Sequence, residues 1–153
     1  MAPVETIRSA RVEDKEALES LQMRASLMWE EDRVQLLAHP EVVAIPLKQL
    51  ERGMVLVAES AGTVVGFAAL AERSDGETEL VGLFVEPELW GQGIASQLMV
   101  EAEALALSRG SKQMHVIANP RAEGFYHRRG YIGVGQTNST WRPAPLMCKQ
   151  LKP

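Results

Sequence analysis

The chain of 153 residues contains a single cysteine, Cys148. One cysteine excludes an internal disulfide and cannot supply a cysteine metal cluster, so we expect a reducing, cytoplasmic location and no bound metal. Apolar stretches are broken by charge well before the ~20 residues that a transmembrane helix requires. The first residues of the chain contain no apolar signal core. These absences predict a cytoplasmic protein with no membrane partner.

The chain also lacks a large excess of charge of either sign. Lys and Arg number 16 against 20 Asp and Glu, for a net charge of −4, and no basic face or stripe stands out. A nucleic-acid partner is therefore not expected. A hydrophobic fraction of 46% at this low net charge also argues against disorder. The length suits one compact domain over residues 1–153, large enough to bury its own core.

Hydrophobic periodicity predicts a mixed α/β (α+β) chain, in the order β-α-α-β-β-β-α-β-α-β-β. The strand-like runs are 4–10, 54–59, 64–70, 77–85, 114–118, 131–134 and 146–151. The helical patterns are 14–28, 47–52, 94–106 and 121–129. We expect a mixed central sheet of about seven strands flanked by about four helices. The segment 29–53 has the weakest pattern of the chain.

The stretch 80–96 carries the clearest chemical signal. A strand ends here, a turn containing Gly91 and Gly93 follows, and a helix begins. The first turn of a helix presents unpaired N–H groups, and glycine lets an anion approach them closely. The two glycines alone are a weak signal, and a plain turn is the commoner reading. The Gly-Lys-Ser/Thr ending of a P-loop and the third glycine of a dinucleotide site are both absent.

The residues around this turn resemble the Gcn5-related N-acetyltransferase (GNAT) superfamily. Its signature is Arg/Gln-x-x-Gly-x-Gly/Ala after a strand that ends in hydrophobic-Val-x-Pro, and residues 83–87 and 91–96 match it. Asn119, Phe125-Tyr126 and Arg129-Gly130-Tyr131 are similar to the family's second landmark. Trp90 departs from the pattern, because the signature has Arg or Gln there. Main-chain N–H donors do not depend on that side chain, so we still expect the turn to bind an anion.

The resemblance extends over nearly the whole chain and implies the GNAT acyl-CoA N-acyltransferase fold. It implies transfer of the acetyl group of acetyl-CoA to a primary amine of a small molecule or peptide. The implied cofactor contacts are Leu83, Phe84 and Val85 for the pantetheine arm, Gly91, Gln92, Gly93, Ile94, Ala95 and Ser96 for the pyrophosphate, and Asn119 and Tyr126. A homodimer is common among relatives and is kept as an expectation.

The resemblance also suggests acid and base groups for direct attack by the amine. Tyr126 is the expected general acid, since a phenol of ordinary pKa ≈ 10 is protonated at neutral pH and can donate to a departing thiolate. Glu79, in the strand leading to the turn, is the candidate base. A solvent-facing strand residue is an equally good reading of Glu79, and a chain of waters could act instead.

Two classes of function remain after the sequence is considered. One is the N-acetyltransferase, and the other is a catalytically inactive regulatory or structural protein that keeps the CoA loop. Tyr126 favours the enzyme. The acceptor is left open among a protein N-terminus, a lysine, a polyamine, an amino acid and an aminoglycoside. Trp29 and Trp141 are candidate aromatics of an acceptor site or an interface, but a packing role is the commoner reading of each.

Overall fold

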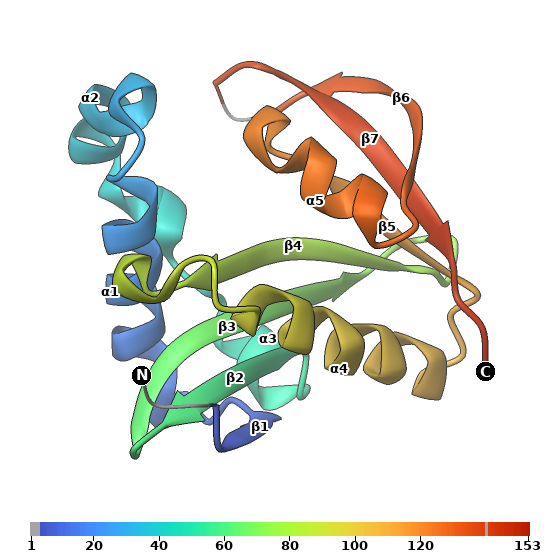
Figure 1. Ribbon diagram of the computed structural model, residues 1–153, viewed down its shortest axis with the longest axis horizontal. Coiled ribbons are helices and arrows are strands. Elements are labelled where there is room, and N and C mark those ends of the chain that lie inside the picture. The colour runs from blue at the N-terminus through green and yellow to red at the C-terminus, as the bar shows by residue number, and fades with distance from the viewer. Residues whose placement is uncertain (1–3, 140) are drawn as a thin grey trace. The chain divides into compact units, whose positions relative to one another are not determined.

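The computed structural model describes residues 4–139 and 141–153 (Figure 1). In these residues seven strands form a sheet in the order β1-β2-β3-β4-β5-β7-β6. The strands are β1 (Thr6–Ser9), β2 (Val55–Ser60), β3 (Thr63–Glu72), β4 (Thr78–Val85), β5 (Gln113–Ile117), β6 (Ile132–Asn138) and β7 (Pro143–Gln150). The described helices are α1 (Lys15–Ser26), α2 (Glu30–Ala38), α3 (Leu47–Glu51), α4 (Ile94–Ser108) and α5 (Glu123–Arg128). The predicted α/β class and the mixed seven-stranded sheet are confirmed.

Helix α2 is an addition to the four helical patterns that the periodicity predicts. Its first turn carries Glu30, Glu31 and Asp32, three acidic residues that are typical of the start of a helix. Leu36 is its buried residue, whereas Val34 is 79% and Leu37 is 61% exposed. Because these apolar residues do not form a stripe that faces the core, hydrophobic periodicity gives no strong signal for this helix.

The chain divides into two compact units. The first comprises Met1–Ala69 and Gly82–Ala102, and the second comprises Leu70–Val81 and Glu103–Pro153. The division passes within β3, β4 and α4. Each unit is therefore described by itself, and a single domain over residues 1–153 stays a prediction.

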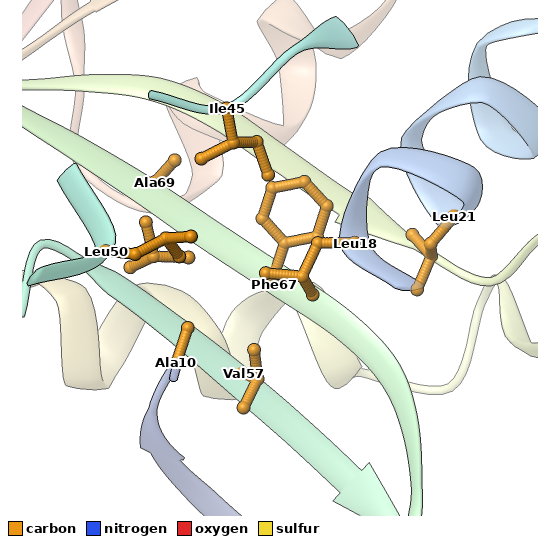
Figure 2. Close-up of a cluster of buried hydrophobic side chains, with 9 residues drawn as sticks. Ala10, Leu18, Leu21, Ile45, Leu50, Val57, Phe67 and Ala69 are labelled. Carbon is orange, nitrogen blue, oxygen red and sulfur yellow. The ribbon is translucent and has the colours of Figure 1, made fainter. Parts of the chain in front are cut away.

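The first unit is built on the antiparallel strands β1, β2 and β3. Its core includes Phe67, which is 1% exposed, and residues of α1 and α3 (Figure 2). The other buried members are Ala10, Leu18, Leu21, Ile45, Leu50, Val55, Val57 and Ala69. Gly66 of β3 lets its neighbours approach, since a Cβ there would lie 3.1 Å from the Phe84 carbonyl oxygen and 3.2 Å from a methyl carbon of Leu98. This close approach sets the starting position of α4 against β3.

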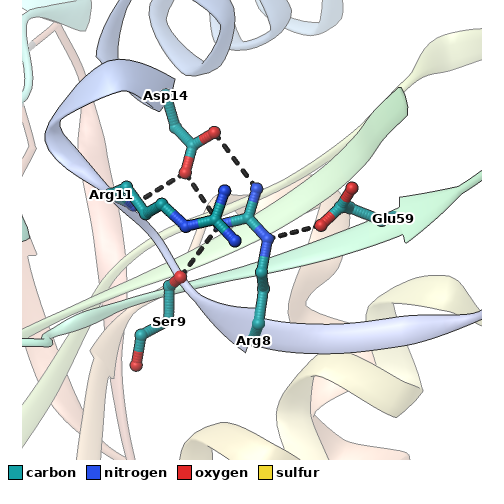
Figure 3. Close-up of polar contacts among 5 residues, drawn as sticks. All are labelled: Arg8, Ser9, Arg11, Asp14 and Glu59. Carbon is teal, nitrogen blue, oxygen red and sulfur yellow. Dashed lines mark hydrogen bonds and ion pairs between the residues drawn. The ribbon is translucent and has the colours of Figure 1, made fainter. Parts of the chain in front are cut away.

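An ion-pair network joins β1, the short 3₁₀ turn Val12–Asp14 and β2 (Figure 3). The Arg8 guanidinium donates to both carboxylate oxygens of Asp14, at 2.8 and 3.1 Å, and also to Glu59. Its Nη1 further donates to the Ser9 carbonyl at 2.9 Å. The hydrogen bonds from Arg8 lower the pKa of Asp14. One arginine therefore anchors the first strand to its neighbours in sequence and in the sheet.

The second unit is built on β5, which pairs parallel with β4 over Thr78–Leu80 and antiparallel with β7. Strand β7 continues into an antiparallel pairing with β6, which has a bulge between Gly133 and Gly135. Glu103 accepts hydrogen bonds from the Tyr131 hydroxyl and from Lys149 Nζ, both at 2.9 Å. These bonds give buried polar atoms of this unit their partners.

None of the helices in the described ranges combines the length and the apolar character of a membrane-spanning segment.

Candidate active site

The turn that precedes α4 is shaped by two glycines with left-handed backbone angles. Gly91 has φ of +82° and Gly93 has φ of +84°, a region that L side chains rarely adopt. A Cβ added to either would meet no atom of the described chain within 4 Å. The first turn of α4, which lies wholly in the described residues, carries no acidic side chain. The positive end of this 15-residue helix is therefore open to an anion.

The end of β4 presents backbone groups on the edge away from β3. The Glu86 N–H donates to the Val65 carbonyl of β3 at 2.8 Å. Because backbone groups alternate between the two edges of a strand, Leu83 and Val85 direct their N–H and C=O groups to the opposite edge. The alternation turns the backbone groups of Phe84 toward β3 instead, and its ring lies 5.4 Å from that of Phe67. Of the three predicted strand contacts, Leu83 and Val85 can therefore pair with a peptide-like ligand through their backbone, whereas the ring of Phe84 packs on Phe67. The contact of each with a cofactor stays a prediction.

Trp90 makes contacts that the sequence did not predict. Its indole N–H donates to the Val85 carbonyl at 2.8 Å. Its ring stacks on Trp29, with centroids 5.5 Å apart and planes inclined by 16°. Trp29 follows α1 and Trp90 precedes α4, so this pair joins segments far apart in the chain. The side chain at the signature's Arg/Gln position is engaged with the protein itself.

Asn119 belongs to the second unit and follows β5. Its Oδ1 accepts the Arg121 backbone N–H at 3.0 Å and so caps the 3₁₀ turn Pro120–Ala122. The side-chain oxygen therefore has a structural partner. The side-chain NH₂ group, with two donors, and the second lone pair of the oxygen stay available for a ligand.

Tyr126 lies on α5 and is 6% exposed. Its ring meets Phe125 edge-on, with centroids 5.2 Å apart, and meets Tyr131 in the same manner at 5.6 Å. Burial raises the pKa of Tyr126 to about 12, because the charged phenolate loses hydration. The phenol is therefore protonated throughout the neutral range.

Glu79 lies in β4 between the buried residues Thr78 and Leu80, each 2% exposed. It shares the other face of the strand with Val81, which is 50% exposed, as the period of two predicts. In the parallel register Glu79 stands beside His115 of β5. The Nε2 atom of His115 is buried and finds no hydrogen-bond partner among the described residues. Glu79 thus occupies the more open face of its strand.

The predicted site residues fall in two groups. The turn and the strand end lie together in the first unit, whereas Glu79, Asn119 and Tyr126 belong to the second. Across residues 4–139 and 141–153, no three His, Cys, Asp or Glu side chains gather as a metal site requires.

Comparison with known proteins places these features in a family. The model of the acetyltransferase (GNAT) family matches residues 16–131. A curated protein of Mycobacterium tuberculosis, named as an uncharacterized N-acetyltransferase, is 32% identical over 83 residues. That match covers 52% of this chain and 53% of the relative, so it spans about half of each protein.

Solved structures show the same architecture. The PaiA N-acetyltransferase from Thermoplasma acidophilum, in complex with coenzyme A, superposes with a TM-score of 0.78 at 20% identity, covering 95% of this chain and 98% of that one. A GCN5-related N-acetyltransferase from Rhodopseudomonas palustris also gives 0.78, at 21% identity, covering 99% and 98%. At identities this low, the structural likeness establishes the fold alone. It confirms the GNAT fold that the motifs predicted. Because the family model matches most of this chain, the chain belongs to the acetyltransferase (GNAT) family.

Proposed function

We propose that this protein is an N-acetyltransferase that uses acetyl-CoA to acetylate a primary amine of a small molecule or peptide. The observation that carries the proposal is the turn of Gly91 and Gly93 at the open start of α4, in a chain that belongs to this family. Acetyl-CoA supplies an acetyl thioester, whose carbonyl carbon forms a bond to the amine nitrogen as the bond to sulfur breaks. The residues of the chain bind this donor and move the protons.

Binding of the donor is assigned to main-chain groups of the first unit. Backbone N–H groups from Gly91 to Ser96 hold the pyrophosphate, helped by the helix dipole. The edge groups of Leu83 and Val85 pair with the amides of the pantetheine arm, as in β-strand addition. Phe84 supports this edge by packing on Phe67. The NH₂ group of Asn119 donates to the arm or to a bridging water.

Substitution of Gly93 by valine tests the turn. A β-branched side chain is strained at a φ of +84° and fills the open space beside the turn that an anion would need. We expect Gly93→Val to raise the Kd for CoA at least about tenfold in isothermal titration calorimetry. A change of this size corresponds to the loss of one to two charge-assisted hydrogen bonds.

Gly62 provides a matched control for this substitution. It has φ of +77°, and a Cβ there also meets no described atom within 4 Å. Gly62→Val introduces the same strain in the turn between β2 and β3. An unchanged Kd for Gly93→Val, or an equal loss in both variants, would contradict the phosphate-binding role.

Proton transfer is assigned to residues of the second unit. Tyr126 donates a hydrogen bond, and then its proton, to the leaving sulfur. With a pKa near 12 against about 8.5 for a free thiol, the phenol is the weaker acid, so hydrogen bonding to the developing charge is its first contribution. Glu79 accepts the proton that the amine loses, directly or through water, from the open face of β4.

Removal of the Tyr126 hydroxyl tests the acid. We expect Tyr126→Phe to lower kcat about 100-fold, within the usual range for a general acid, with the Kd for CoA unchanged. Thiol release from acetyl-CoA across an amine panel measures the rate. The same assay, run over a range of pH, tests the base, and Glu79→Gln should displace the acidic limb of the pH–rate profile. Full turnover in Tyr126→Phe would remove the acid role, and an unaltered profile in Glu79→Gln would assign the base to water. If wild-type protein binds CoA but releases no thiol with any amine, the inactive alternative is supported.

A further inference from the structure

Trp90 occupies the one position of the signature at which this chain departs from the family pattern. Trp90 is 40% exposed, yet its indole N–H and one face of its ring have protein partners. The indole N–H is its only polar group, and the Val85 carbonyl takes it. The exposed indole is thus held in one orientation rather than left in solvent.

The carbonyl that Trp90 binds lies on the edge of β4 proposed to pair with the cofactor. Val85 points away from β3, because its neighbour Glu86 donates to Val65 on the β3 side. A carbonyl oxygen has two lone pairs, so the indole occupies one and leaves the other. The hydrogen bond therefore spans from the turn to the strand edge within the first unit.

Two further contacts fix the same region. Stacking on Trp29 holds the face of the Trp90 ring. One residue after Val85, Glu86 accepts a two-pronged ion pair from Arg24 of α1, at 2.9 and 2.8 Å. Bidentate pairs of this kind restrict both partners to one geometry. The end of β4 is therefore tied to α1 independently of Trp90, and Trp90 ties the turn to the end of β4.

We propose that Trp90 is a positioning residue for CoA: it locks the phosphate-binding turn to the pantetheine-binding edge of β4, so that one ligand can engage both. This inference rests on the proposed function. A ligand that spans the turn and the edge gains from the fixed spacing, because less flexibility is lost on binding. A ligand that engages the turn alone gains nothing from it.

The test compares CoA with ADP, which has a pyrophosphate but no pantetheine arm. Trp90→Phe keeps an aromatic ring for Trp29 and removes the N–H donor. We expect the Kd for CoA to rise about three- to tenfold, the value of one hydrogen bond, while the Kd for ADP stays within about twofold. Trp29→Leu, which keeps the indole donor and removes the stacking, should give a smaller loss with the same preference for CoA. Trp29→Leu also replaces Trp90→Phe as the test variant if Trp90→Phe fails to fold.

Circular dichroism provides an independent readout of the stacked pair. The exciton couplet of two stacked indoles should disappear in Trp90→Phe and in Trp29→Leu, and persist in Trp141→Phe. Equal losses for CoA and ADP in Trp90→Phe, or no loss for either, would overturn the positioning role. Failure of the wild-type protein to bind CoA and ADP at all would instead refute the proposed function, so the two failures are distinguishable.

Discussion

Both tyrosines of the chain, Tyr126 and Tyr131, are buried, at 6% and 1% exposed. Burial raises the pKa of each phenol, and the neighbouring carboxylate of Glu103 raises that of Tyr131 further. Tyr131 has a clear structural role, because its hydroxyl donates to Glu103. The structure therefore separates one tyrosine bound to a partner from one proposed to act on a ligand.

Alkaline titration provides a prediction at the scale of these two residues. A raised folded-state pKa means that the folded protein keeps protons that the unfolded chain loses above pH about 10. The associated stability is fully present below pH 10 and is lost as the pH rises toward the folded value near 12. We expect almost no phenolate absorbance at pH 10.5 in the native protein, and ionisation together with unfolding at higher pH.

The denatured protein is the control, and its tyrosines should titrate near pH 10. Half-ionised tyrosine at pH 10 in a protein whose circular dichroism is still native would contradict the burial of these side chains.

Among the elements, β1 is the shortest strand described, with four residues, and Arg8 is its main attachment besides the ladder. Asp14 accepts two hydrogen bonds from the guanidinium, at 2.8 and 3.1 Å, and also accepts the Arg11 backbone N–H at 2.7 Å. Its side chain is 14% exposed, so solvent screens this pair only in part. The position of β1 should therefore depend on this carboxylate.

Substitution of Asp14 by asparagine is the corresponding test. We expect Asp14→Asn to lower the free energy of unfolding by about 1–2 kcal/mol at pH 7, measured by urea denaturation. A lowered folded-state pKa contributes stability that is present above the unfolded value near 3.9 and lost as the pH falls through the folded one. The difference between wild type and variant should thus shrink at pH 3.

Asp75 provides a matched control, since it also accepts hydrogen bonds from an arginine, Arg73, but lies in an exposed turn. Asp75→Asn should change the unfolding midpoint little. Equal effects of the two substitutions would show that the Arg8 network adds nothing beyond a surface pair.

At the same scale, the elements differ in how readily the sequence revealed them. The periodicity predicted α4 and the central strands, because each repeats apolar residues on a buried face. Strand β6 was also predicted, although its residues are mostly exposed. It gave no strong signal for α2, whose Val34 and Leu37 point to solvent. A helix with one buried side chain lacks the stripe on which such predictions depend.

For the molecule as a whole, the candidate site could be predicted where it is local in sequence. The turn of Gly91 and Gly93 and the β4 edge lie within a dozen residues, so a motif captures them. The stacking of Trp90 on Trp29 is a tertiary contact between distant segments, and no local pattern encodes it. The engagement of the Asn119 oxygen with Arg121 is local, but the same spacing also suits a ligand-binding role.

The strand order has a final consequence for association between molecules. Strand β6 lies at an edge of the sheet, and most of its residues are exposed, including Ile132 at 64% and Val134 at 57%. An edge strand of seven residues offers a row of unpaired backbone N–H and C=O groups with which a strand of another chain could pair. The bulge between Gly133 and Gly135 breaks the regular spacing of that row. Fibril-like stacking through the backbone of β6 is thereby disfavoured.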